Sequence, residues 1–244
     1  MREGLCAMRI LVTAGPTREF FDTVRFISNP SSGKMGYALA RAARRRGHQV
    51  VLISGPVALK PPAGVQVVPV VSAAEMSKAC KKTFPWCDAV IMTAAVCDYR
   101  PAYRLDHKLR KQARSRHVPL VPTEDILATL GRRKAGRILV GFAMEDHDAR
   151  RHAASKLRRK NLDAILLNGP GNIGGDAAQM DLLTAGGAWE RWPSSTKNAL
   201  AIRVVRLVED LAAGRSVRTR GATQTHPLGP RRDRTRIPTA RPRR

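Results

Sequence analysis

Short, almost uninterrupted runs of aliphatic residues recur along the chain, and such runs are typical of strands that are buried on both faces of a sheet. Between most of them lie stretches in which apolar residues return with helical spacing. The pattern predicts six strands, at residues 9–15, 49–56, 65–70, 88–96, 137–143 and 163–168.

The stretches between the strands carry residues suited to the starts and ends of helices. In SSGKMGYALARAARRRG, Met35, Ala38 and Leu39 fall on one helical face, and Ser31 or Ser32 can cap the start. SAAE is a capping box for the second helix. We expect helices at about 31–46, 72–83, 123–131, 147–160 and 195–213, and a hairpin formed by MDLLTA and AWERWP.

Strands and helices alternate before the hairpin, while residues 97–122 are polar, basic and irregular. This order predicts an α/β fold: a doubly wound Rossmann-like, mostly parallel sheet with helices on both faces and a small C-terminal hairpin. In such sheets, ligands bind outside the carboxyl ends of the strands. Those ends are TAGPTRE, TAAVCDYR, GFAMED and LNGPGN.

The loop after the first strand lacks the motifs of two common classes of nucleotide-binding protein. TAGPTRE is neither the GxGxxG fingerprint of dinucleotide-binding sheets nor the GxxxxGK[ST] of P-loop enzymes. The second strand ends in LISGP, without the acidic residue that holds an NAD ribose. A nicotinamide-dependent reductase on a Rossmann-like fold is therefore an alternative that lacks its expected residues.

The stretch RFISNPSSGKMG (25–36) combines small polar residues with cations. Gly33 removes side-chain bulk at a helix start, whose free amides favour an anion, and Lys34 adds a positive charge. Asn29 carries two amide donors that can hold a carboxylate or carbonyl oxygen. A capped helix with a surface lysine, preceded by an Asn-Pro turn, explains the same residues, so both interpretations stay open.

Two further basic stretches are candidates for anion binding. HKLRKQ places Lys108 and Lys111 in the irregular segment, and SKLRRKNLD places Lys156 and Lys160 four residues apart on one helical face. Like charges at that spacing repel unless an anion lies between them, which favours a triphosphate. A solvated basic surface is the alternative in so basic a protein.

The net charge of +25 raises nucleic acid as a partner. Residues 214–244 hold ten Arg and one Asp, so we expect a disordered Arg-rich tail there, after an N-terminal extension at 1–7 and one folded domain at 8–213. A basic nucleic-acid-binding protein is a second alternative, although aromatic residues for base stacking make up only 5%. We expect nucleic acid to bind only non-specifically, through the tail.

The four cysteines form no CxxC pair and no His/Cys ligand spacing, so a zinc site is not expected and no residue is assigned as a metal ligand. No run of 18 apolar residues is present, which predicts no membrane span. Reduced thiols suit a cytoplasmic protein.

The motifs together are more specific than any one of them. LVTAGPTREFFDTVRFISNPSSGKMGYALARAA resembles the opening of phosphopantothenate–cysteine ligases, and SAAEM, AAVCDYRP, HKLRKQ, PTEDIL, ILVGFAME and KLRRKNLDAILLN follow in the order of that family. The resemblance covers about residues 8–211 and includes the ligase half of the bifunctional bacterial coenzyme A enzyme. It makes 8–213 a ligase domain.

The resemblance implies a two-step ligation. The carboxylate of phosphopantothenate attacks the α-phosphate of CTP, pyrophosphate leaves, and the amine of cysteine then displaces CMP from the acyl-cytidylate to give phosphopantothenoylcysteine. It also implies Mg²⁺ on the phosphates and a homodimer, for which the hairpin at 180–192 is a candidate contact. The flavin-binding decarboxylase half is not found in this sequence, so we expect no flavin and a separate phosphopantothenoylcysteine decarboxylase.

The resemblance also implies roles for particular residues. Asn29 matches the residue that holds the acyl intermediate, with Arg25 just before it, and Lys108 matches a lysine that assists acyl-cytidylate formation. The nucleotide-binding positions are Gly15, Ala94, Asp98, Lys108, Glu124, Asp125, Ile126, Leu127, Phe142, Lys156 and Lys160, and the substrate or phosphate positions are Ser31, Ser32, Gly33 and Lys34.

The chain departs from the family pattern at a few positions. Cys97 stands where Ala is usual, Arg110 replaces a lysine, and Met144 replaces an alanine. Arginine presents a planar fork and lysine a point charge, so position 110 can contact a ligand differently. Cys97 has no base beside it in the sequence, and we do not expect it to be a nucleophile.

Overall fold

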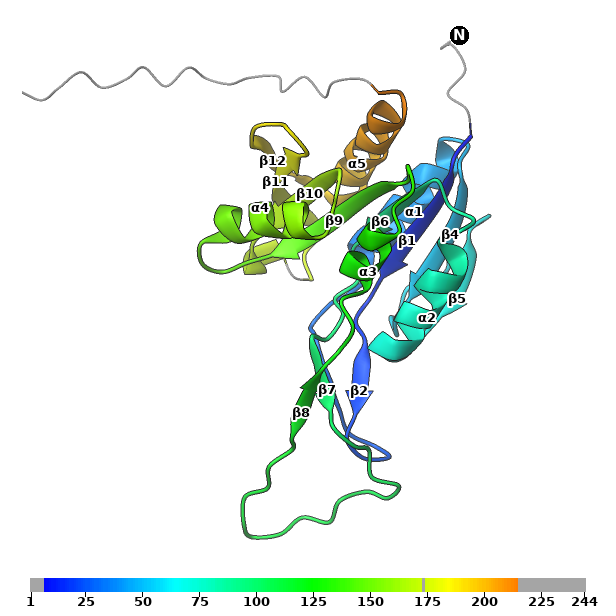
Figure 1. Ribbon diagram of the computed structural model, residues 1–244. Helices are drawn as coiled ribbons and strands as arrows, with labels where there is room; N and C mark the ends of the chain where they lie inside the picture. Colours follow the sequence, from blue (N-terminus) through cyan, green and yellow to red (C-terminus); the bar gives the residue numbers. More distant parts are fainter. Residues whose placement is uncertain (1–6, 173, 215–244) are drawn as a thin grey trace, which may run out of the picture.

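The chain folds into an α/β body from which a long, narrow arm projects (Figure 1). The computed structural model describes residues 7–172 and 174–214. The N-terminal extension expected at 1–7 and the Arg-rich tail expected at 214–244 therefore lie, apart from one residue of each, outside the described residues.

One eight-stranded sheet forms the body, in the order β12-β11-β10-β9-β6-β1-β4-β5. Neighbouring strands from β10 to β5 pair in parallel, whereas β11 and β12 form an antiparallel hairpin beside β10. The predicted fold class, its six strands and the hairpin are confirmed. The strands are β1 (Arg9–Ala14), β4 (Gln49–Ser54), β5 (Gln66–Pro69), β6 (Ala89–Met92), β9 (Ile138–Met144), β10 (Ala164–Asn168), β11 (Ala177–Thr184) and β12 (Glu190–Thr196).

The chain builds outward from β1 in both directions. It first adds β4 and β5 on one side and then β6, β9 and β10 on the other, so the order reverses between β1 and β6. At such a switch point the crossover connections leave in opposite directions and a crevice opens at the carboxyl ends of the strands. The fold therefore places a candidate site beside the ends of β1 and β6.

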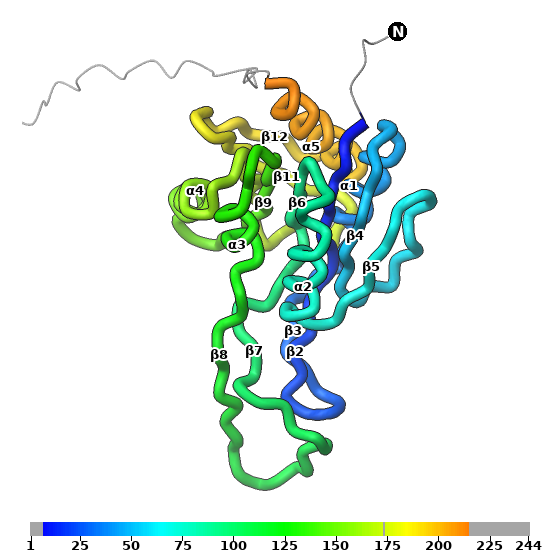
Figure 2. Tube along the Cα trace, turned by 45° about the vertical axis from the view of Figure 1, so that its right-hand side comes forward, coloured from blue at the N-terminus to red at the C-terminus, as the bar shows by residue number. Residues whose placement is uncertain are grey.

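Helices cover both faces of the sheet (Figures 1 and 2). Side chains of β1 alternate between two cores, with Ile10 and Val12 packing on one face and Leu11 on the other. This is the pattern of a strand buried on both sides. One face carries α1 (Lys34–Arg45) and α5 (Lys197–Ala212), and the other carries α2 (Ala73–Thr83), α3 (Ile126–Arg132) and α4 (Ala149–Arg159); a short 3-10 turn, η1 (Pro170–Asn172), follows β10.

The helix starts follow the expected chemistry in one case and depart from it in another. Ser72 caps α2 by accepting a hydrogen bond from the backbone N–H of Glu75 at 3.2 Å, as predicted. The prediction that Ser31 or Ser32 caps α1 is wrong, because the N-cap is Gly33 with φ +73° and no side-chain cap. A left-handed residue at that point costs least for glycine, which lacks a Cβ.

The arm (residues 17–29 and 97–123) was not predicted. It contains two antiparallel pairs of short strands, one of them within residues 97–122, for which the sequence indicated irregular structure (Figures 1 and 2). The strands are β2 (Arg18–Phe20), β3 (Phe26–Ser28), β7 (Tyr99–Pro101) and β8 (Leu120–Pro122).

The buried carboxylate of Asp22 ties the two limbs of the arm together. It accepts hydrogen bonds from the backbone N–H groups of Val24 (2.8 Å), Arg25 (2.7 Å) and Leu109 (3.2 Å). Burial alone would raise the pKa of Asp22, but these N–H donors, with the Arg25 guanidinium, hold its pKa below the usual value. One carboxylate thus fixes both the turn after β2 and the distant loop around Leu109.

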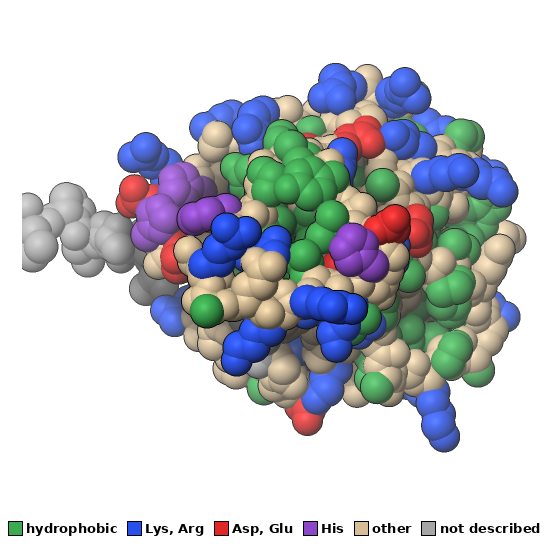
Figure 3. Space-filling view, turned by 90° about the horizontal axis from the view of Figure 1, so that it is seen from below, with side chains coloured by type: hydrophobic (Ala, Val, Ile, Leu, Met, Phe, Trp, Pro, Cys, Tyr) green, Lys and Arg blue, Asp and Glu red, His purple; other side chains and the backbone are tan. Residues whose placement is uncertain are grey.

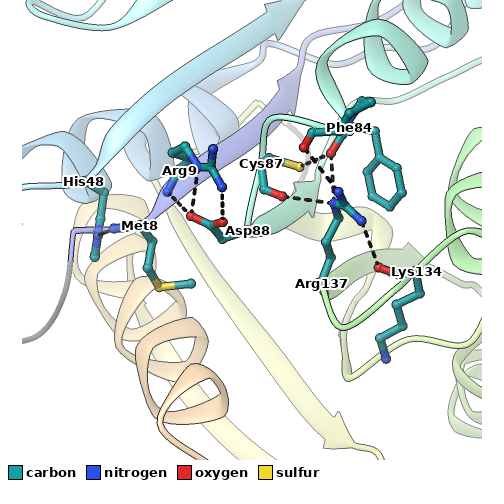
Figure 4. Close-up of polar contacts among 9 residues, drawn as sticks. Met8, Arg9, His48, Phe84, Cys87, Asp88, Lys134 and Arg137 are labelled. Atoms are coloured by element: carbon teal, nitrogen blue, oxygen red, sulfur yellow. Dashed lines mark hydrogen bonds and ion pairs between the residues drawn. The ribbon is translucent and has the colours of Figure 1, made fainter.

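The end of the sheet opposite the carboxyl ends is held by arginines (Figure 4). Arg9 donates to Asp88 from both its backbone N–H and its guanidinium, each at 2.8 Å, which joins the starts of β1 and β6. Arg137 donates to the carbonyl oxygens of Phe84 (3.0 Å), Cys87 (3.1 Å) and Pro85 (3.2 Å), and so ties the end of α2 to the start of β9.

A buried ion cluster joins α5 to the end of α1. Glu209 accepts two hydrogen bonds from Arg46, at 2.7 and 2.6 Å, and its Oε1 lies 2.9 Å from Nε2 of the buried His48. His48 Nδ1 accepts from the backbone N–H of Met8 at 3.2 Å. Although burial alone would raise the pKa of Glu209, the hydrogen bonds from Arg46 and His48 hold it below its ordinary value of 4.5.

Replacing Glu209 with Gln is expected to lower the free energy of unfolding at pH 7 by about 2–4 kcal/mol, because Arg46 loses its carboxylate in a buried setting. Since the pKa of Glu209 is lower in the folded state, its stabilisation is present above about pH 4.5 and is lost as the pH falls further. The gap between wild type and variant in urea unfolding should narrow towards acid pH. An equal gap at every pH would contradict this assignment.

Candidate functional site

The carboxyl ends of β1 and β6 are joined through the buried side chain of Thr13. Its Oγ1 accepts hydrogen bonds from the backbone N–H groups of Thr93 and Ala94, both at 3.1 Å. In return, Thr93 Oγ1 donates to the carbonyl oxygen of Thr13 at 2.6 Å, and the N–H of Ala95 donates to Gly15 O at 2.9 Å. These bonds end β6 at Met92 and hold residues 93–96 as one wall of the crevice.

The start of α1 forms the facing wall, and glycines allow its close approach. A Cβ at Gly36 would lie 2.4 Å from Cβ of Ala14, and one at Gly33 would lie 2.8 Å from Val57 Cγ1 and 3.4 Å from the backbone N of Gly15. A side chain at Gly36 would therefore clash with β1, and one at Gly33 would be strained by the φ of +73° as well as close to Val57. The helix start, with its unpaired backbone N–H groups, therefore rests directly on the end of β1.

Between these walls lies a cavity of about 500 Å³. This volume is typical of small-molecule sites. Residues far apart in the sequence meet here, including most of those predicted from it. The predicted residues that line the cavity are Asn29, Ser31, Ser32, Gly33, Lys34, Ala94, Asp98, Glu124, Asp125, Ile126, Leu127, Phe142, Lys156 and Lys160. Gly15 lies behind Gly33 rather than in the lining.

The side chain of Asn29 is anchored to the opposite wall. Its Nδ2 donates to the carbonyl oxygens of Ala95 (3.2 Å) and Val96 (3.1 Å). The two donors that the sequence suggested for a ligand are thus directed at backbone. Asn29 holds the 95–96 loop against the segment that leads into α1, and its amide oxygen is the polar atom left for a ligand.

Lys156 and Lys160 both line the cavity, each beside its own carboxylate. Lys156 Nζ donates to Glu145, and Lys160 Nζ lies 3.0 Å from Asp125 Oδ2. These ion pairs relieve the repulsion expected between two lysines one helical turn apart. They also hold both ammonium groups at the α3 and α4 side of the cavity.

The carboxylate of Glu124 is occupied within the protein. It accepts hydrogen bonds from Ser77 (2.6 Å), Lys81 (2.8 Å) and Thr129 (2.9 Å). The hydrogen bond from Lys81, followed by that from Ser77, lowers the pKa of Glu124 to about 2. Glu124 therefore positions the start of α3 as a fixed anion, and its polar atoms are engaged on the side of α2.

Arg25 and Lys108 lie on the arm and not among the residues that line this cavity. The Arg25 guanidinium donates to the carbonyl oxygen of Leu109 at 2.6 Å, so it fixes the loop that carries Lys108. Lys108 lines a second cavity on the arm, together with Tyr103, Arg110 and Arg116. Figure 3 views the molecule from the side of the arm and shows many Lys and Arg side chains on that face.

Several residues that line the cavity were not predicted from the sequence, among them Asn168, Asn172 and Lys197. Asn168 ends β10, Asn172 ends η1, and Lys197 begins α5. The signal for Lys197 was its position, since a cation in the first turn of a helix opposes the helix dipole and calls for a functional explanation. Both asparagines lie in LNGPGN, one of the strand ends at which a ligand was expected, but neither was assigned to the site.

In residues 7–172 and 174–214, no helix is long and apolar enough to cross a membrane. The same part of the chain holds no group of three or more His, Cys, Asp or Glu side chains placed to bind a metal ion.

Comparison with known proteins identifies the family. The model of the family described as DNA/pantothenate metabolism flavoprotein C-terminal domain matches residues 5–211. The chain belongs to this family. The match spans the sheet, the arm and every residue of the cavity lining, so the site described above lies within the matched domain.

Individual relatives agree with the resemblance seen in the sequence. The chain is 50% identical over 160 residues to the coenzyme A biosynthesis bifunctional protein CoaBC of Bacillus subtilis, covering 65% of this chain and 39% of that protein. It is 42% identical over 206 residues to a cysteine/cysteine sulfinic acid decarboxylase of an unknown prokaryotic organism, covering 82% and 57%. The chain thus spans about two fifths to three fifths of these relatives.

Among solved structures, the crystal structure of the C-terminal domain of CoaBC superimposes with a TM-score of 0.75 at 40% identity. The superposition covers 85% of this chain and 96% of that domain. The resemblance to the ligase half of the bifunctional coenzyme A enzyme is therefore confirmed, and the α/β fold of this chain is the fold of the family.

Cys97, one of the departures from the family pattern, is buried behind the wall of the cavity. Its backbone N–H donates to Thr17 Oγ1 at 3.0 Å, and its thiol lies 3.6 Å from Thr17 O. Burial raises the pKa of the Cys97 thiol. A protonated, enclosed thiol packs as a small apolar group, in agreement with the expectation that it is not a nucleophile.

Asn29→Asp is expected to destabilise this member of the family more than Asn29→Ala. The aspartate would set a carboxylate against the carbonyl oxygens of Ala95 and Val96, whereas alanine only removes two hydrogen bonds. At neutral pH, we expect the free energy of unfolding of Asn29→Asp to be roughly 1 kcal/mol lower than that of Asn29→Ala. Urea unfolding of both variants measures this difference. Equal stability of the two variants would mean that the amide faces the cavity instead.

Proposed function

We propose that this chain joins phosphopantothenate to cysteine, with CTP as the activating nucleotide and an acyl-cytidylate as the intermediate. The observation that carries the proposal is the gathering of the implied nucleotide and substrate residues in one cavity at the switch point of the sheet. The likeness to the C-terminal domain of CoaBC supports the same assignment.

The two ends of the cavity suit the two halves of such a reaction. Phe142 and Leu127 supply apolar contact for a nucleotide base, and Lys156 and Lys160, which also line the cavity, supply charge for its phosphates. The start of α1, through Gly33 and the backbone that follows it, offers amides for the anion that develops at the reacting centre. Asn29 fixes the 95–96 wall, so that the reacting groups are held in a constant orientation.

Magnesium fits this site as a phosphate-bound ion. Mg²⁺ usually keeps several waters and takes only one or two carboxylates from the protein besides the phosphates of a substrate. Asp98 lines the cavity and is the residue that would hold it, since Asp125 is already paired with Lys160 and caps α3. When bound, the ion would neutralise charge on the phosphates.

The ligase proposal predicts that the purified chain releases pyrophosphate from CTP in the presence of Mg²⁺ and phosphopantothenate, and that CMP appears when cysteine is added. Asn29→Ala should lower the rate about 100-fold, because a displaced wall misaligns the reacting groups. Lys82→Met, at an exposed position on α2, is the matched control and should leave the rate unchanged.

Two results would count against the ligase. One is the absence of substrate-dependent pyrophosphate release with both CTP and ATP. The other is release of CO₂ from cysteine or cysteine sulfinic acid without pyrophosphate, which would favour the activity named for the decarboxylase relative.

We propose further that the active form is a homodimer in which the arm meets a second copy of the chain. The arm exposes large apolar side chains, among them Phe26 (39%), Tyr99 (56%) and Leu120 (48%). If Lys108 assists acyl-cytidylate formation, as the resemblance implies, it must reach the cavity at the switch point of a sheet. In its own chain it lies on the arm, outside that cavity. Contact between the arms of two copies would cover the apolar residues. It would also bring Lys108 near the switch-point cavity of the other copy.

The double variant Tyr99→Glu, Leu120→Glu is expected to sediment as a monomer at concentrations where the wild type is a dimer, because both charges would be buried in the contact. Ile202→Glu is the control, since Ile202 is an exposed apolar residue (41%) on α5. A dimer that survives in the arm variant but dissociates in Arg191→Glu would place the contact at the 180–192 hairpin instead.

A further inference from the structure

Two lysines meet at the end of the cavity that α1 and α5 form. Lys34 is the first residue of α1 and Lys197 the first residue of α5, and both line the cavity. The two helices pack against each other on one face of the sheet (Figure 2). A cation in a first helical turn is unfavourable, and here the arrangement occurs twice at one place.

Lys34 is paired with the carboxylate of Asp176, whereas the ammonium group of Lys197 contacts a backbone carbonyl oxygen. Lys34 Nζ donates to Asp176 Oδ1 at 2.7 Å and to the carbonyl oxygen of Gly174 at 3.1 Å. Lys197 Nζ donates to the carbonyl oxygen of Asn172 at 3.3 Å, and its backbone N–H donates to Asp176 O at 2.8 Å. The Asp176 side chain is 89% exposed, so this carboxylate lies at the rim of the cavity.

The charge at this end is only partly balanced. Burial, followed by the nearby Lys34 charge, lowers the pKa of Lys197, while Asp176 acts in the opposite direction. Two ammonium groups against one exposed carboxylate leave a net positive end inside a cavity. A second anion there would be favoured by both lysines.

This end is separate from the lysines assigned to the nucleotide. Lys156 belongs to α4 and Lys160 follows it, both beside carboxylates on the opposite face of the sheet. One cavity therefore has a pair of lysines from each face. Asn168, at the end of β10, also lines the cavity, and its buried Oδ1 has no hydrogen-bond partner among the described residues, which leaves an acceptor for a donor group of a ligand.

We infer that Lys34 and Lys197 form a second phosphate subsite, and that Asp176 occupies Lys34 until a phosphate group takes its place. The ligand chemistry is a phosphate group carried on a longer molecule. Two molecules could supply this phosphate group: phosphopantothenate, through its phosphate, and CTP, through its terminal phosphates. The inference rests on the proposed function only for the choice of these two molecules. Lys197 would be a binding residue, and Asp176 an internal competitor.

The subsite is tested by titration calorimetry on the full chain with inorganic pyrophosphate as the probe. Lys197→Met should weaken pyrophosphate binding about tenfold, the loss of one charge-assisted hydrogen bond. Lys197→Arg should restore most of it, and Asp176→Asn should tighten it several-fold, because the competing charge is gone. Lys82→Met removes the same charge from an exposed site on α2 and should have no effect.

The source of the phosphate follows from two ligand pairs. If the subsite holds the phosphate of phosphopantothenate, Lys197→Met weakens phosphopantothenate binding but leaves pantothenate binding unchanged. If it holds the terminal phosphates of the nucleotide, the variant weakens CTP binding but leaves CMP binding unchanged. Either result supports the subsite.

Wild-type affinity of Lys197→Met for pyrophosphate, phosphopantothenate and CTP would overturn the inference, and so would a weaker pyrophosphate affinity in Asp176→Asn. These outcomes differ from failure of the ligase proposal, which would appear as a wild-type protein that binds neither phosphopantothenate nor CTP. In that case the pyrophosphate titration still tests the subsite by itself.

Discussion

The site depends on the hydrogen bonds of Thr13 at the switch point of the sheet. A parallel sheet that reverses its order leaves a gap between its two central strands, and the backbone at the ends of those strands loses its ladder partners. Thr13 supplies the missing acceptor for two N–H groups of the 93–94 turn. Because β6 must end there, the chain turns out of the sheet, lines the crevice and continues into the arm.

Charge is distributed in this protein so that cations at the site are held but not neutralised completely. Lys156 and Lys160 each have a carboxylate, whereas Lys34 is paired with Asp176 at the rim and Lys197 Nζ contacts only the carbonyl oxygen of Asn172 among the described residues. Elsewhere, acidic residues stabilise the fold. Asp22 accepts hydrogen bonds from backbone N–H groups of the arm, and Glu124 accepts them from side chains of α2 and α3. Most carboxylates near the cavity are therefore committed to protein groups, and a net positive site remains for anionic ligands.

The body of the fold could be predicted from the sequence because its signals are local. Runs such as RILVTAG and DAILLN form buried strands wherever they lie in a parallel sheet, and the capping box at Ser72 acts within one turn. The arm could not be predicted, because each of its strands has only three residues, too few to show a periodic pattern. Its geometry depends on Asp22 and Arg25 reaching Leu109, contacts between residues more than 80 positions apart.

The contrast between local signals and contacts of distant residues also explains which predictions for the site were right and which were incomplete. Motifs at strand ends identified most of the lining, since the fold brings all carboxyl ends to one edge. A motif does not show which atoms of a side chain are free to bind a ligand. The amide donors of Asn29, for example, are bound to the carbonyl oxygens of Ala95 and Val96 in the cavity wall. Lys34 makes the same point for charge: it lies at the predicted place, but Asp176 already holds it, so an incoming phosphate must be the better partner. A dianion that meets two ammonium groups satisfies that condition, whereas a single carboxylate at the rim meets only part of it.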